Sequence, residues 1–187
     1  RTEPCQTTYQ HKIECLAELE DLSEKKLIDL YYADETRVNM EGYVPYGWQF
    51  SDEDVFVPCE KSLGLNCFGL LSRTNEFHFS TSISTIDSQF VIEQLEDFSF
   101  GLERMTVVVL DNARVHTSKA VKERRAFWEE RGLYLFYLPA YSPELNIIEI
   151  LWRELKCRWL KPEDYACVAV LFYQVTLALM AVGGLLR

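Results

Sequence analysis

Hydrophobic residues recur along the chain at two spacings, and each spacing predicts a different kind of element. Apolar positions three and four residues apart predict amphipathic helices over 9–26, 88–98 and 118–131. Short apolar runs predict strands, and they lie at 27–33, 63–71, 76–82, 107–110 and 133–138. The predicted order is therefore a helix, a three-stranded meander, and then helices that alternate with strands.

Turn-forming residues mark the ends of several of these elements. Glycine and proline predict a hairpin over 38–50, and Ser84 or Thr85 is a candidate N-cap for the second helix. A segment bounded by two prolines, 139–143, follows the last strand. A helix whose first turn carries Glu149 is predicted to begin after this break.

An antiparallel meander followed by parallel strands predicts an α/β fold with one mixed sheet and helices on both faces. The ribonuclease H-like architecture has this order of elements, and its first strand lies in the middle of the sheet. We expect a single catalytic domain over 1–187. Its core is expected at about 27–160, with a helical lead-in at 1–26 and a C-terminal helical tail at 161–187.

The composition predicts a folded domain in the cytosol rather than in a membrane. The chain has 187 residues, 48% of them hydrophobic, which suits one folded domain. Its six cysteines form no C-x-x-C pair and indicate reduced, mostly buried thiols of a cytosolic protein. The apolar stretch 166–186 has the length of a membrane span, but Gln174 and Thr176 interrupt it. We therefore expect a packed terminal helix and no membrane partner.

The net charge of −10 is unevenly distributed along the chain. Residues 104–161 carry 11 Lys and Arg against 7 Asp and Glu, whereas the rest of the chain carries 8 against 22. A locally basic segment can meet the phosphates of nucleic acid even in an acidic protein. A solvated helix face is the alternative interpretation of the same residues.

Three acids are candidates for chemistry because of where they stand. Asp34 follows the first apolar run, Asp111 follows the fourth, and Glu149 opens a late helix. Ligands of open α/β sheets bind at the carboxyl ends of strands. Phosphodiester chemistry uses two divalent cations, which two or three carboxylates can hold. Either Asp34 or Asp111 could bridge the two cations.

Each of these candidates has a simpler interpretation. Asp111 could be the first residue of an Asp-Asn turn, and Glu149 a first-turn acid favoured by the helix dipole. Glu35 is expected to point away from Asp34, because neighbouring residues of a strand face opposite ways. Trp48 and Trp152 are expected in the core.

Five further residues are candidates for supporting roles. Asn112 and Asn146 are expected to hold the loops that carry the acids. His116 could contact phosphate or form an ordinary loop hydrogen bond, and Arg114 and Lys119 could contact the DNA backbone.

Two sequence blocks resemble one enzyme family. LDNARVH, followed by LPAYSPELNIIEILWRELK, is similar to the catalytic core of DDE transposases of the mariner superfamily, in particular its bacterial insertion-sequence branch. The resemblance covers roughly residues 27–160, and the Asp34-Glu35 pair after an apolar strand agrees with it. It implies that Asp34, Asp111 and Glu149 are a metal-binding catalytic triad in a ribonuclease H-like domain.

The resemblance also implies an activity and its partners. Such enzymes need Mg²⁺ or Mn²⁺, cut double-stranded DNA at terminal inverted repeats, rejoin it to target DNA, and commonly act as homodimers. A cytoplasmic, nucleoid-associated place in a prokaryote follows. The chain departs from the family at Ile147, where proline is usual, and shows no upstream DNA-binding domain. Two alternatives stay open: a ribonuclease H-like nuclease without strand transfer, and an inactive DNA-binding or dimerisation module.

Overall fold

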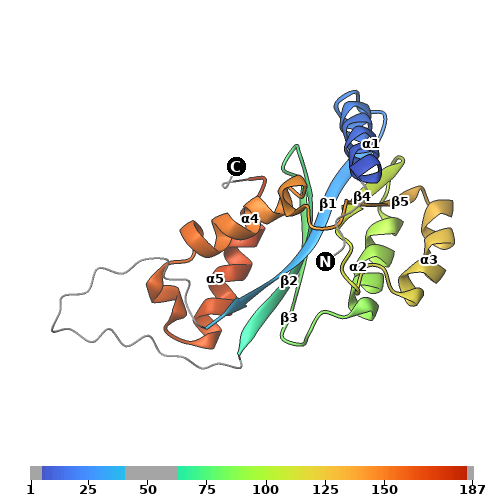
Figure 1. The fold of residues 1–187 in the computed structure, drawn as a ribbon. Coiled ribbons are helices and arrows are strands. Elements are labelled where there is room, and N and C mark those ends of the chain that lie inside the picture. The colour runs from blue at the N-terminus through green and yellow to red at the C-terminus, as the bar shows by residue number, and fades with distance from the viewer. Residues whose placement is uncertain (1–5, 41–62, 185–187) are drawn as a thin grey trace.

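The computed structural model describes residues 6–40 and 63–184, which form a sheet with helices on both of its faces (Figure 1). Three short turns of 3-10 or π-helix, Pro143–Leu145, Leu155–Trp159 and Pro162–Tyr165, flank the fourth and fifth helices. The main elements are α1 Gln6–Glu24, β1 Asp29–Asn39, β2 Gly64–Ser72, β3 Phe77–Ser82, α2 Ser88–Phe100, β4 Thr106–Leu110, α3 Lys119–Glu130, β5 Leu133–Tyr137, α4 Ile148–Glu154 and α5 Val168–Met180.

The sheet has the predicted mixed topology. Its strand order is β3-β2-β1-β4-β5, so β1 lies in the middle. The pairs β1–β2 and β2–β3 are antiparallel, whereas β1–β4 and β4–β5 are parallel. Because β1 and β4 are parallel neighbours, the residues near their carboxyl ends are brought to the same region of the sheet.

Two hydrophobic cores lie on the two faces of the sheet, as the layers in Figure 1 show. One core joins the sheet to α4 and α5 and includes Tyr32. The other joins it to α2 and α3 and includes Tyr31 and Ala33. Side chains of a strand alternate between faces, so consecutive residues of β1 enter different cores.

The prediction that the first strand ends at Ala33 is wrong. β1 continues to Asn39, because Tyr31 to Asn39 pair residue by residue with β2. Backbone pairing satisfies the N–H and C=O groups whatever the polarity of the side chain. Asp34 and the residue after it therefore lie inside the strand. Of the predicted hairpin over 38–50, the first two residues belong to β1, and 41–50 lie outside the described residues.

The predicted helices are present, with small changes at their ends. The N-cap of α2 is Asp87 rather than Ser84 or Thr85, and its carboxylate accepts a hydrogen bond from the Phe90 N–H at 2.9 Å. Ser118 caps α3 in the same way, through the Val121 N–H.

Helix α1 is tied to the sheet by two polar contacts. Lys12 Nζ donates to the backbone oxygen of Tyr137 at 2.5 Å and to that of Leu138 at 3.3 Å. The buried Tyr32 hydroxyl donates to Glu20 near the other end of the helix. The predicted helical lead-in is thus anchored to β5 as well as to β1.

The C-terminal apolar stretch forms a helix that packs against the rest of the domain. Helix α5 packs into the core through Leu171, Val175 and Leu179. Within the described residues, no helix is both long and apolar enough to cross a membrane.

The expectation of mostly buried thiols is wrong for the described cysteines, which are all free. Only Cys67 is buried, while Cys15 is partly exposed and Cys157 and Cys167 are exposed.

Candidate active site

Asp34 is held in the middle of β1, on the face that α4 covers. Its partner in the β2 register is Gly69. A Cβ at Gly69 would lie 2.7 Å from Phe77 Cε2 and 3.0 Å from both Ile148 Cδ1 and Trp152 Cη2. The missing side chain therefore lets α4 approach the sheet directly opposite Asp34.

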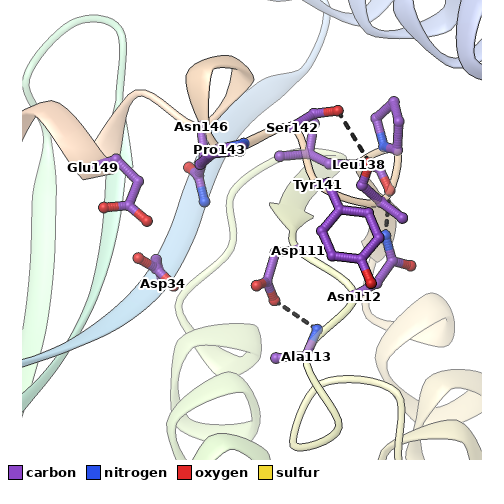
Figure 2. A pocket seen from close by; sticks show the side chains of 12 residues that line it. Asp34, Asp111, Asn112, Ala113, Leu138, Tyr141, Ser142, Pro143, Asn146 and Glu149 are labelled. Carbon is purple, nitrogen blue, oxygen red and sulfur yellow. Dashed lines mark hydrogen bonds between the residues drawn. The ribbon is translucent and has the colours of Figure 1, made fainter. Parts of the chain in front are cut away.

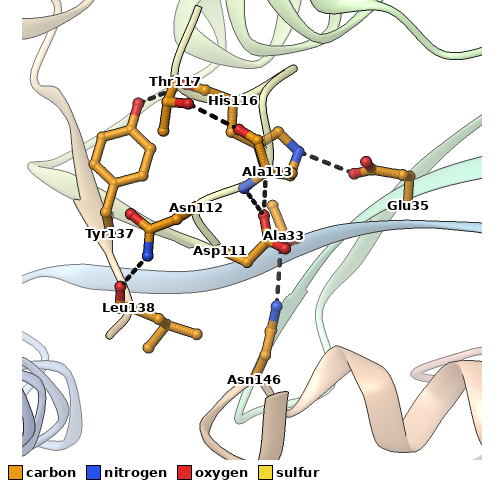
Figure 3. Close-up of polar contacts among 10 residues, drawn as sticks. All are labelled: Ala33, Glu35, Asp111, Asn112, Ala113, His116, Thr117, Tyr137, Leu138 and Asn146. Carbon is orange, nitrogen blue, oxygen red and sulfur yellow. Dashed lines mark hydrogen bonds and ion pairs between the residues drawn. The ribbon is translucent and has the colours of Figure 1, made fainter. Parts of the chain in front are cut away.

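Asp111 is the first residue after β4 and begins a loop rather than a helix. Its Oδ1 accepts hydrogen bonds from the Ala113 N–H at 2.8 Å and from His116 Nδ1 at 2.7 Å (Figure 3). The neighbouring Asn112 side chain donates to the Leu138 backbone oxygen. The loop is thus tied to its own next turn and to the end of β5.

Glu149 is the second residue of α4, and the start of this helix is tied to β1. Asn146 Nδ2 donates to the backbone oxygen of Ala33 at 3.2 Å, next to Asp34. Ile147 has φ −62° and ψ −25°, so it adopts the φ value that proline would impose. The backbone at Ile147 is therefore one that a proline could adopt.

The three acids line one pocket of about 390 Å³, together with Asn112, Asn146 and the 138–143 segment. Figure 2 shows Asp34 and Glu149 near each other and Asp111 across the pocket, turned toward the Ala113 N–H. Three elements distant in sequence thus bring the predicted triad to one place.

The electrostatics of Asp34 are set by burial and by other acids. Burial raises the pKa of Asp34, and the nearby charges of Glu149 and Glu35 raise it further, to about 8. Asp111 adds a smaller effect in the same direction. Asp34 is therefore held largely protonated near neutral pH, and a nearby positive charge would favour its ionised form.

Asp111 has the opposite environment because His116 is beside it. The hydrogen bond from His116 lowers the pKa of Asp111, against the effect of burial. His116 is fully buried, and its Nε2 also forms an ion pair with Glu35 Oε2 at 2.9 Å (Figure 3). Burial disfavours the charged imidazole, but the two carboxylates outweigh it and raise the pKa of His116 to about 9.

The pocket suits a hard divalent cation by the kind of atoms it offers. Carboxylate and amide oxygens are the ligands that Mg²⁺ and Mn²⁺ prefer. The mutual repulsion around Asp34 fits a bound cation, as does the buried Oδ1 of Asn146, which has no hydrogen-bond partner within the part of the chain that the structure describes. Among the described residues, however, no three His, Cys, Asp or Glu side chains converge closely enough to form a metal-binding group as they stand.

The remaining predicted residues fall into two groups. Asn112 and Asn146 line the pocket, and His116 holds Asp111. Arg114 and Lys119 are exposed and do not line it. Trp152 is buried, as expected, whereas Trp48 lies outside the described residues.

Sequence reasoning missed two parts of the site. Glu35 points away from Asp34, as expected, but its role as the second partner of His116 was not foreseen. Tyr141 lines the pocket with its side chain 80% exposed and φ of 61°, a backbone conformation that non-glycine residues seldom adopt. In the sequence, Tyr141 lies between Pro139 and Pro143, and this spacing of prolines could have predicted an unusual turn there.

Known proteins with the same fold include transposases and integrases. The Mos1 transposase paired-end complex with left transposon end matches with a TM-score of 0.58 and 14% identity over 97% of this chain and 60% of that one. The catalytic core domain of BIV integrase matches with a TM-score of 0.50 and 13% identity over 82% of both chains. This chain thus spans about three fifths of the Mos1 chain.

A third match is the intasome of simian T-cell lymphotropic virus, with a TM-score of 0.57 and 12% identity over 82% of this chain and 47% of that one. These likenesses confirm the ribonuclease H-like fold of transposase and integrase cores. No curated protein sequence matches significantly. The model of the family described as DDE superfamily endonuclease matches residues 29–171, well over half of the chain. The chain therefore belongs to the DDE superfamily of endonucleases.

Proposed function

We propose that this chain is the catalytic domain of a transposase that cuts DNA at the ends of a mobile element and joins the freed strand to target DNA. One observation carries the proposal: Asp34, Asp111 and Glu149 come from β1, the loop after β4 and α4, and line a single pocket. The family membership and the fold shared with the Mos1 strand transfer complex support it.

The proposal includes two divalent cations, Mg²⁺ or Mn²⁺, held by these three acids. When bound, such ions activate the attacking oxygen and neutralise the charge that develops at the phosphate. The chain supplies ligands from a rigid strand, a tied loop and a docked helix, which fixes where the phosphate can lie. Among the structures with this fold is a Mos1 paired-end complex with Mn.

His116 contributes to this arrangement without entering the pocket. It is a positioning residue, because its Nδ1 holds Asp111 Oδ1 and its Nε2 is held in turn by Glu35. Asp111 is thereby fixed in one orientation and kept ionised, ready to bind a cation through its other oxygen.

Double-stranded DNA is the proposed substrate, and a homodimer the proposed active form. The exposed Arg114 and Lys119 lie in the locally basic part of the chain and could contact phosphates on either side of the cut. One stripe of α5, which includes Tyr173 and Met180, is exposed and could contribute to a dimer contact. Light scattering of the purified protein would test the oligomeric state.

The test is a cleavage and joining assay on DNA that carries candidate terminal inverted repeats. We expect Mg²⁺-dependent nicks at the repeat ends and joined products with target DNA. Asp34→Asn, Asp111→Asn and Glu149→Gln should each lower the rate by roughly a thousandfold or more, because the acids act as a unit. Glu144→Gln and Glu154→Gln are matched controls, since neither residue lines the pocket.

Other outcomes would replace the proposal. Cleavage without joined product would indicate a ribonuclease H-like nuclease. DNA binding without metal-dependent cleavage would indicate a binding or dimerisation module. Full activity in the triad variants would contradict the assigned site.

A further inference from the structure

Asn146 has an acceptor atom that the fold leaves unused. The residue is only 3% exposed and lines the pocket of the three acids. Its Nδ2 donates to the Ala33 backbone oxygen at 3.2 Å. A backbone carbonyl can only accept, so this contact fixes which end of the amide faces β1. The other end, Oδ1, is buried and has no hydrogen-bond partner among the described residues.

The usual structural role of such an asparagine does not account for this oxygen. Asn before a helix commonly accepts a hydrogen bond from a first-turn N–H. In α4, no side chain caps the N-terminus, and the Glu149 N–H donates instead to the backbone oxygen of Asn146 at 3.1 Å. An acceptor buried without a partner loses its hydration and gains nothing in return, which destabilises the fold. Neither α4 nor β1 therefore supplies a hydrogen-bond donor to this oxygen.

The surroundings of the oxygen limit what can satisfy it. The nearby pocket walls carry the carboxylates of Asp34 and Glu149, which are acceptors when ionised. Figure 2 shows the Asn146 amide on the same side of the pocket as these two acids. A cation, or water molecules bound to it, would supply the missing positive partner to all three oxygens at once.

We propose that Asn146 Oδ1 is a neutral oxygen donor of the divalent-cation site, facing the cation or its hydration shell, in addition to the three acids. The proposal rests on the proposed function, because it requires that the pocket bind a cation. Asn146 thus has two tasks: its Nδ2 ties α4 to β1, and its Oδ1 helps to set cation affinity.

Substitutions at Asn146 separate the two tasks. Asn146→Ala removes both the tie and the oxygen, whereas Asn146→Asp removes the tie but keeps an oxygen at the same place. The readout is the affinity of the purified chain for Mn²⁺ in the absence of DNA. Electron paramagnetic resonance of the free Mn²⁺ measures it. We expect Asn146→Ala to weaken Mn²⁺ binding about tenfold, while Asn146→Asp binds at least as tightly as the wild type.

Thermal unfolding in EDTA gives the structural reference. Both variants should unfold at a lower temperature than the wild type because both lose the hydrogen bond to Ala33, and Asn146→Asp should lose more because it adds a carboxylate beside Asp34 and Glu149. Asn66→Ala is the matched control, because buried Asn66 donates to the Ser84 backbone oxygen at 2.9 Å and does not line the pocket. It should lower stability similarly and leave Mn²⁺ binding unchanged.

Two results would overturn the inference. One is wild-type Mn²⁺ affinity in Asn146→Ala despite lower stability. The other is an equal loss of affinity in the Ala and Asp variants, which would assign the whole effect to the tie. If the wild type bound Mn²⁺ no better than a protein carrying both Asp34→Asn and Glu149→Gln, the proposed function itself would fail.

Discussion

Asp34 and Glu35 are neighbours on β1, yet the two faces of the sheet give them opposite surroundings. Glu35 faces α2 and α3 and is paired with His116, which also holds Asp111. Asp34 faces α4 and has acids as its charged neighbours, so its pKa rises to about 8. The Glu35 face holds His116 between two carboxylates, whereas the charges that shift the pKa of Asp34 come from other acids. This difference is why we propose the cation site on the Asp34 side of the strand.

This difference predicts how stability changes with pH when no metal is present. The folded pKa of Asp34, about 8, is above its ordinary value of 3.8, so the folded state holds a proton that the unfolded state releases. Stability should therefore fall as pH rises from about 4 to about 8. His116 has a folded pKa of about 9 against 6.5, so its contribution is present below pH 6.5 and is lost as pH rises through 9.

The strongest test of the comparison is to neutralise each acid in turn. At pH 8 in EDTA, Asp34→Asn should raise the free energy of unfolding by on the order of 2 kcal/mol, and the gain should vanish near pH 4. Glu35→Gln should instead lower it by about 1–2 kcal/mol, because His116 loses an ionised partner. Chemical denaturation at both pH values measures this. Changes of the same sign in the two variants would contradict the comparison.

On the Glu35 side of the strand, the residue to replace is His116, which bridges Glu35 and Asp111. His116→Gln removes the charged bridge between Asp111 and Glu35, so Asp111 is no longer fixed in orientation. We expect DNA cleavage to fall about 10- to 100-fold, as is usual when a partner of a metal ligand is removed. A higher Mg²⁺ requirement should accompany the loss. Wild-type cleavage and Mg²⁺ dependence in this variant would show that the bridge is merely structural.

The Asp34 face can be disturbed without touching an acid. Gly69→Ala places a Cβ 2.7 Å from Phe77 Cε2 and 3.0 Å from Ile148 Cδ1 and Trp152 Cη2, so the side chains that pack α4 against the sheet must shift. We expect a loss of about 1–3 kcal/mol in stability and a lower cleavage rate. Gly101→Ala is the control, because its Cβ would meet only the Phe98 oxygen at 3.8 Å. Equal effects of the two substitutions would show that packing at Gly69 has no special importance.

The smallest expected effect concerns the departure from the family at Ile147. Its φ of −62° suits proline, and among the described residues its N–H donates no backbone hydrogen bond. Asn146 before it has φ −97° and ψ 102°, which a following proline tolerates. Ile147→Pro should therefore change the free energy of unfolding by less than about 1 kcal/mol. A larger loss, measured by thermal unfolding, would mean that the Ile147 side chain is essential to the α4 contact.

The sequence was sufficient for the order of elements and for choosing three acids that line one pocket, because both depend on local patterns. Apolar runs that break at Asp111 and before Glu149 are visible without the fold. The length of β1 was not visible, since its polar half is kept in the sheet by pairing with β2. A local pattern contains no information about a partner strand that provides this pairing.

The contacts around the acids depend on registers that no single segment specifies. His116 reaches Glu35 only because β1 and β4 pair in parallel, with Tyr32 opposite Val109. The tie from Asn146 to Ala33 likewise joins residues 113 positions apart. The residue types could be proposed as supports from sequence, but their partners could not.

The contact of Lys12 with the end of β5 also helps to hold the wall of the pocket. Lys12 and Asn112 both donate to the Leu138 backbone oxygen, and Leu138 begins the segment that walls the pocket. Helix α1 and the Asp111 loop therefore share one anchor point. Loss of either donor would therefore change the contacts that hold the first residue of the segment lining the pocket.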